Sequence, residues 1–227
     1  MTVKIPSHPG YIAFFLLLAF LCYQAHQLTR HLVGTALCGG FGTMTFTVTI
    51  TKEPCLFPTL VTLSGPALTY GLAWVGMFLL RSEKNKLFAY TLIFASFAHL
   101  RFIQTLTGRG DELILADGWF EITSRAIVAL VVFLIGLPPV ITAFRAIANR
   151  RRVLVFLGSW LLPLPLLFVM LFGNQYLFGA NGDQIGSPSI FGISLIVFLT
   201  DLAASILLIV VGIQFFRSDD QANPNTR

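Results

Sequence analysis

Residues 126–144 read Ala-Ile-Val-Ala-Leu-Val-Val-Phe-Leu-Ile-Gly-Leu-Pro-Pro-Val-Ile-Thr-Ala-Phe, and no charged side chain lies between Arg125 and Arg145. A helix needs about 20 mostly apolar residues to cross the hydrocarbon core of a bilayer, because each residue adds only about 1.5 Å of rise. Other stretches of the chain share this length and apolar character. The sequence therefore predicts about six transmembrane helices, at residues 11–37, 57–80, 87–106, 122–147, 153–178 and 190–216.

The composition favours the same fold class, an all-α membrane protein. Of the 227 residues, 56% are hydrophobic and only 11% are charged. A soluble domain needs charged groups on its exterior, whereas a protein in lipid needs an apolar exterior. We expect residues 1–216 to form one polytopic domain in the inner or plasma membrane, and residues 217–227 to form a disordered cytoplasmic tail.

The basic residues are divided unequally between the two sides of the predicted bundle. The formal net charge is +5, but lysine and arginine lie in short turns between apolar stretches, which argues against binding of nucleic acid. Only Lys52 and Arg109 fall on the side opposite the N-terminus. The N-terminal side holds Lys4, Arg81, Lys84, Lys86, Arg145, Arg150, Arg151, Arg152, Arg217 and Arg227. By the positive-inside rule, both termini are expected in the cytoplasm.

Several ionisable side chains occur where the chain should be apolar. Such groups are costly in a bilayer, so they usually face the interior of the helix bundle and often mark function. Those toward the non-cytoplasmic end are His26, Arg30 and His31 in the first span, His99 and Arg101 in the third, and Asp111 and Glu112 just after it. We expect these groups to approach one another at that end of the bundle.

Three other charged residues have simpler interpretations. Asp201 is the only acid deep in the sixth span, where it could move protons or ions or pair with a neighbouring helix. Glu121 and Arg125 are four residues apart, the spacing of an ion pair on one helix.

A β-structure is predicted directly after the first span. Thr45, Thr47, Thr49 and Thr51 alternate with apolar residues, and glycines precede them. This period of two is typical of a strand and predicts a short hairpin over the non-cytoplasmic end of the bundle. Cys38 and Cys55 bracket the segment. They either form a disulfide, which would stabilise the fold by about 3 kcal/mol, or remain two buried thiols.

The order of these motifs resembles the intramembrane zinc metalloproteases of the site-2 protease type. The resemblance covers roughly residues 20 to 115: a histidine-bearing helix, a glycine-rich turn into a strand, a helix that begins near Ser64-Gly-Pro66, and a later Gly-Asp at Gly110-Asp111. In that family a His-Glu-x-x-His helix supplies two zinc ligands and a general base, and a later Asp supplies the third ligand.

The resemblance implies a role for each matching position. His26 matches the first ligand, Gln27 occupies the position of the general base, and Arg30 occupies that of the second ligand. Glutamine cannot accept a proton from a zinc-bound water, and the arginine cation repels Zn²⁺. A zinc site would therefore need His26, His31 and Asp111, with His31 displaced around the helix from the usual spacing of four.

Four functions are consistent with the sequence. The embedded groups could form a structural network of ion pairs that includes Arg30, His99, Arg101 and Glu112, or the chain could be a pseudoprotease that binds a transmembrane partner without cleaving it. An active zinc metalloprotease with a non-standard site and a small transporter or channel are the alternatives. Zinc is the only cofactor implied, because no nucleotide-binding glycine motif is present. We expect no enzymatic activity.

Overall fold

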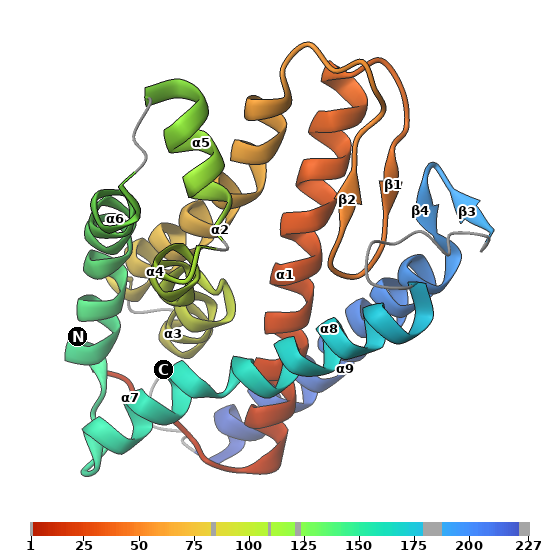
Figure 1. Cartoon of the computed structure of the whole chain (residues 1–227). Helices are drawn as coiled ribbons and strands as arrows, with labels where there is room; N and C mark the ends of the chain where they lie inside the picture. Colours follow the sequence, from red (N-terminus) through yellow and green to blue (C-terminus); the bar gives the residue numbers. More distant parts are fainter. Residues whose placement is uncertain (1, 83–84, 109, 121–123, 179–187, 223–227) are drawn as a thin grey trace.

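The computed structural model describes residues 2–82, 85–108, 110–120, 124–178 and 188–222 (Figure 1). Most of these residues are helical. The helices are α1 (Pro9–Leu37), α2 (Pro58–Leu80), α3 (Lys86–Ala95), α4 (Ala98–Leu106), α5 (Asp111–Phe120), α6 (Arg125–Ala146), α7 (Arg152–Leu161), α8 (Pro163–Phe178) and α9 (Leu195–Ala222).

Within the described residues, six helical segments are long and apolar enough to cross a membrane, which confirms the predicted number. The third segment joins α3 and α4, and the fifth joins α7 and α8. The sequence does not predict α5, which follows the third segment and lies outside all six. The helix α9 extends to Ala222, beyond the predicted end of the sixth span, and residues 223–227 lie outside the described part.

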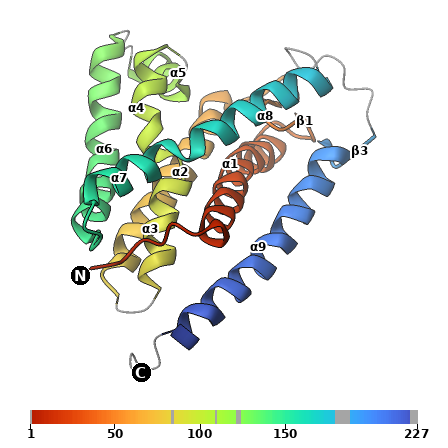
Figure 2. The same cartoon turned by 90° about the horizontal axis from the view of Figure 1, so that it is seen from below.

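The helix α1 lies at the centre of the molecule and packs against α2, α3 and α9 (Figures 1 and 2). It begins where the His8 side chain accepts a hydrogen bond from the backbone nitrogen of Tyr11, and Pro9 occupies its first turn, where a missing N–H has no consequence. The main apolar core joins α1 to α3 through fully buried rings such as Phe15 and Tyr90. This core fixes the position of α1 relative to the third segment.

The third segment is interrupted where the sequence predicts one continuous helix. Phe97 adopts a left-handed conformation with φ of 62°, which is uncommon for a residue with a side chain. Ser96 supports the break, because its Oγ accepts a hydrogen bond from the backbone nitrogen of Ala98 at 3.4 Å. The break immediately precedes α4 and so sets the direction in which His99 and Arg101 point.

The small sheet has four strands of two residues each: β1 (Thr43–Met44), β2 (Thr49–Ile50), β3 (Ser189–Ile190) and β4 (Ile193–Ser194). Their order is β2-β1-β4-β3, with β1 parallel to β4. The predicted hairpin is present as β1 and β2, but the threonine alternation does not form one strand. Thr45 donates its backbone N–H to Val48 at 2.9 Å, so the intervening residues form the turn.

The second hairpin corrects the predicted start of the sixth span. The predicted helix begins at residue 190, but residues 189–194 form β3, β4 and the turn between them, and α9 begins at Leu195. Gly192 explains the difference, since its φ of +79° suits glycine. A Cβ at Gly192 would also collide with the carbonyl oxygen of Gly42, and close approach of these backbones lets Met44 donate to the Gly192 carbonyl at 2.9 Å.

Two covalent or backbone contacts hold the ends of the bundle. Cys38 and Cys55 form a disulfide, which joins the end of α1 to the segment before α2. At the opposite end of α1, Val3 pairs with Ile147 just after α6. The N-terminus therefore lies at the same end of the molecule as the turn between α6 and α7.

Candidate functional site

The candidate site is built around His26, which lies on the inner face of α1. Its Nδ1 is 2.9 Å from the hydroxyl of Thr69 on α2. A Cβ on Gly65 would lie 2.6 Å from both Cε1 and Nε2 of His26, so only glycine lets α2 approach the imidazole this closely. The Ser64-Gly65-Pro66 motif therefore forms one wall of the site, although it lies inside α2 and not at the start of the helix as the sequence predicts.

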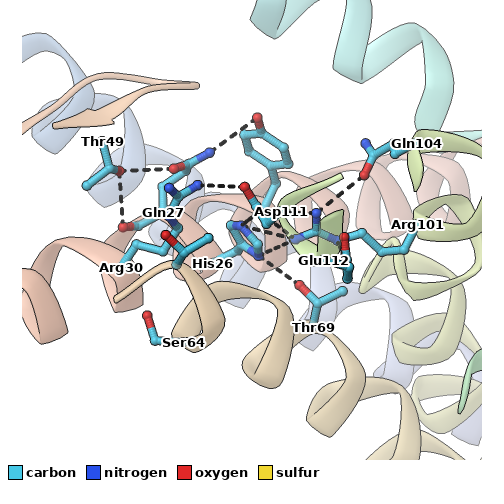
Figure 3. A network of polar contacts seen from close by, with 12 residues as sticks. His26, Gln27, Arg30, Thr49, Ser64, Thr69, Arg101, Gln104, Asp111 and Glu112 are labelled. Carbon is cyan, nitrogen blue, oxygen red and sulfur yellow. Dashed lines mark hydrogen bonds and ion pairs between the residues drawn. The ribbon is translucent and has the colours of Figure 1, made fainter. Parts of the chain in front are cut away.

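Arg101 on α4 contacts His26, Asp111 and Glu112 and so joins the members of the cluster (Figure 3). Its Nη2 donates to the imidazole of His26 and lies 3.1 Å from Nδ1 and 3.2 Å from Nε2. Its Nη1 donates to Asp111 Oδ2 at 3.3 Å and to Gln104 Oε1 at 3.4 Å. A buried arginine is stable only when such acceptors surround it.

Asp111 begins α5 and is the shared acceptor of the cluster. Arg30 donates to its Oδ1 at 3.3 Å, and its Oδ2 also lies 3.6 Å from Nε2 of His26. Burial raises the pKa of Asp111, but the hydrogen bond from His26 and the charges of Arg30 and Arg101 outweigh burial and lower that pKa to about 2. The carboxylate is therefore ionised at any physiological pH.

Glu112 extends the cluster toward α2. Its Oε1 accepts a hydrogen bond from the Tyr70 hydroxyl at 2.9 Å and lies 3.6 Å from Nε of Arg101. Glu112 is buried, and its Oε2 has no hydrogen-bond partner among the described residues. The two acids at the start of α5 thus hold this helix against α1, α2 and α4.

Gln27, at the position of the general base in the resembled family, contacts the hairpin instead. Its Oε1 accepts a hydrogen bond from the Thr49 hydroxyl at 3.0 Å (Figure 3). Its Nε2 donates to the Thr47 carbonyl at 3.2 Å. A second donation reaches the Tyr23 hydroxyl at 3.4 Å. Both ends of the amide are satisfied, so Gln27 anchors the sheet to α1.

His31 and His99 do not join the cluster. Nε2 of His31 is 2.9 Å from the Phe191 carbonyl oxygen in the second hairpin. His99 points to the other side of α4, where its Nε2 is 3.1 Å from the Trp160 carbonyl oxygen of α7. His31 therefore does not lie with His26 and Asp111, as the predicted zinc site requires, because it is one residue beyond the helical spacing that would place it beside His26. His99 likewise does not belong to the network of ion pairs in which it was predicted.

The residues present do not fit a zinc ion. Among the described side chains, no three of the His, Cys, Asp and Glu type come together as a metal site. Both ring nitrogens of His26 contact Arg101, and both carboxylate oxygens of Asp111 accept hydrogen bonds from arginine. These guanidinium cations occupy the donor atoms that a metal would need and would repel it.

A cavity of about 530 Å³ lies beside the cluster. Its polar lining comes mainly from α1, α4 and α5, with Thr69 from α2, and includes Tyr23, His26, Gln27, Arg30, Arg101, Gln104 and Asp111. Its apolar lining includes Leu164, Leu167, Phe168 and Leu171 of α8. The volume is within the range of about 300–1,000 Å³ that is usual for sites of small ligands. A space with one polar and one apolar region suits an amphipathic occupant.

Sequence reasoning missed the contributions of α2 and α8 to this site. Thr69 and Tyr70 follow the Ser-Gly-Pro motif and form a polar pair in an apolar stretch, which was a usable signal. No comparable signal marks the leucines and phenylalanine of α8, because apolar residues are expected throughout a span.

Asp201 and Arg125 do not line the cavity. Asp201 on α9 has a buried Oδ1 without a hydrogen-bond partner in the part of the chain that the structure describes, so the predicted pairing with a neighbouring helix is not seen there. Glu121 lies outside the described residues, and with it the predicted pair with Arg125.

Comparison with known proteins identifies no relative: no family model matches the sequence, and neither the curated proteins nor the solved structures searched contain a match.

Proposed function

We propose that this chain is a multi-pass integral membrane protein that binds a membrane-borne partner or ligand in the cavity beside Arg101, without catalysis. The six long apolar helices support residence in a membrane. So do the large apolar side chains exposed along α6, α8 and α9, such as Leu134, Val169 and Ile209, which water would not favour.

Two independent features support an orientation with both termini in the cytoplasm. The backbone pairing of Val3 with Ile147 brings the N-terminus to the end of the bundle that also carries Arg150 to Arg152, as the positive-inside rule favours. The Cys38–Cys55 disulfide lies at the other end of α1, and disulfides persist on the oxidising side of a membrane. The sheet and the candidate site are then toward the non-cytoplasmic side.

The observation that carries the proposal is the placement of Arg101. In a site-2-type metalloprotease the helix that bears His26 would present a metal and a base to the substrate. In this chain Arg101 donates to both His26 and Asp111, and Gln27 is used to hold the hairpin. The cavity is present although glutamine and arginine stand at the positions of the general base and of the second zinc ligand. This arrangement supports a non-catalytic counterpart of that family that has kept a binding space.

Native mass spectrometry of the detergent-purified chain tests the proposal. We expect a non-covalently bound molecule from the membrane to remain on part of the protein. Leu167→Trp should remove it, because Leu167 lines the cavity and the larger ring would fill the space. Val169→Trp on the outer side of the same helix is the matched control, since Val169 is exposed and does not line the cavity. Equal occupancy in all three proteins would reject the cavity as a binding site.

A further inference from the structure

One edge of the Arg30 guanidinium group, formed by Nε and Nη2, has no hydrogen-bond acceptor among the described residues. Arg30 donates to Asp111 through Nη1 at 3.3 Å. Its Nε is buried and has no hydrogen-bond partner, and none of the described residues accepts from its Nη2. A buried donor without an acceptor has lost its hydration without replacement, and this loss is larger for a charged group. Arg30 lines the cavity, so a bound molecule could supply an acceptor to Nη2, and a small turn of the guanidinium toward that molecule would bring Nε within its reach as well.

The acceptor atoms that line the cavity near Arg30 already receive hydrogen bonds from arginine side chains. Both oxygens of Asp111 accept from Arg30 or Arg101. Glu112 does not line the cavity; it faces Tyr70 and Nε of Arg101. The Gln104 oxygen accepts from Arg101, which leaves the amide nitrogen of Gln104 as a further donor toward the space. The polar end of the cavity therefore offers donors, and a ligand that bears acceptors would complete it.

An anionic group with two adjacent oxygens matches the free edge best. The Nε–H and one Nη–H of a guanidinium point in parallel, and carboxylates and phosphates accept both in a bidentate pair. The remainder of the ligand would have to be apolar, because Leu164, Leu167, Phe168 and Leu171 line the same space.

We propose that the cavity binds a single-chain anionic amphiphile, with its head group on the free edge of Arg30 and its acyl chain against α8. The inference rests on the proposed binding function and names the ligand class. The head group is the carboxylate of a fatty acid or the phosphate of a lysophospholipid. A whole transmembrane helix of a partner, about 30 Å long, is too large for a space of about 530 Å³.

Equilibrium binding to the full chain in non-ionic detergent tests the inference with three radiolabelled probes: palmitate, palmitoyl lysophosphatidic acid and hexadecanol. We expect at least one of the two anions to bind one per chain and at least tenfold more tightly than the alcohol. The tighter of the two anions identifies the head group. Arg30→Gln should abolish the preference for an anion over the alcohol, and Arg30→Lys should retain part of it, because lysine keeps the charge without the bidentate edge.

Arg81→Gln is the matched control. Arg81 follows the last turn of α2 and packs over the Phe78 ring at 5.4 Å, and it does not line the cavity. The variant should leave all three affinities unchanged. If Arg30→Gln proves too unstable to purify, the affinities of the anions and the alcohol for the unaltered protein still show whether an anionic head group is preferred. This comparison needs no substitution.

The outcomes separate this inference from the proposed function. Equal affinity for the anions and the alcohol, with both blocked by Leu167→Trp, would overturn the anionic head group and leave the binding cavity intact. Binding of the anions that Leu167→Trp does not reduce would place them elsewhere and overturn the inference, whereas the proposed function is decided separately by the native mass spectrometry. A loss of anion preference in Arg81→Gln as large as in Arg30→Gln would also overturn the assignment to Arg30.

Discussion

Replacing Asp111 with asparagine should destabilise the protein substantially. Asn keeps the shape of the side chain but removes the charge that Arg30, Arg101 and His26 share. The pKa of Asp111 is lowered from 3.8 to about 2, and each unit corresponds to about 1.4 kcal/mol of preference for the ionised form, or about 2 kcal/mol in total. The carboxylate is only 18% exposed, so solvent screens this interaction little.

The loss is measurable as a shift in the melting temperature of detergent-purified protein, followed by tryptophan fluorescence. For a chain of this size about 2 kcal/mol corresponds to a decrease of roughly 4–8 °C. Asp117→Asn is the matched control, because Asp117 lies on the same helix but is exposed. A melting temperature for Asp111→Asn equal to that of the control would refute the role assigned to the carboxylate.

The pH dependence provides a second check on Asp111. Its folded-state pKa is lower than its ordinary value, so its contribution to stability is present above about pH 4 and is lost as the pH falls toward 2. The difference in melting temperature between the unaltered protein and Asp111→Asn should therefore be constant near neutral pH and shrink on acidification below about pH 4. A difference that grows on acidification would contradict the ion-pair assignment.

Other substitutions test the rest of the structure. Arg101→Leu should destabilise the fold by about 3–5 kcal/mol, because it leaves carboxylates without their cation, and Arg101→Lys should recover only part of this in the same melting assay. Cys38→Ser should free Cys55 for maleimide labelling added from the non-cytoplasmic side, whereas the unaltered protein should label there only after reduction. Gly192→Ala should disrupt the sheet, since its Cβ would meet the Gly42 carbonyl, and should make the segment that contains β1 and β2 more sensitive to limited proteolysis than a Gly173→Ala control, where space is open.

The helices could be predicted from sequence because their signal is local. Long apolar stretches bounded by polar turns require no knowledge of neighbours. Both ends of α1 and α2, the start of α7 and the end of α8 agree with the predicted ends of their spans within two residues. The break at Phe97 was not predictable from apolar periodicity, since it depends on a left-handed residue within an otherwise apolar run. The strands β3 and β4 were missed for a related reason: their apolar residues continue directly into α9, and their pairing with β1 is non-local.

The site was predictable in outline and not in detail. Charged groups that cannot remain in an apolar medium must meet, and this argument correctly predicts that His26, Arg30, Arg101 and Asp111 lie together. The same argument predicts His99 in the cluster, but a histidine can also be satisfied by a backbone carbonyl, and His99 contacts one on α7. Backbone acceptors leave no trace in a sequence pattern.

Zinc analysis of the detergent-purified chain tests most directly the claim that the contacts of Arg101 with His26 and Asp111 leave no room for a zinc ion. The protein, exposed to equimolar zinc and then passed through a desalting column, should retain far less than one zinc per chain, and His26→Ala should not change that amount. One zinc per chain in the unaltered protein, lost in His26→Ala, would contradict the account, because the guanidinium of Arg101 and a metal cation could not both occupy the space between His26 and Asp111.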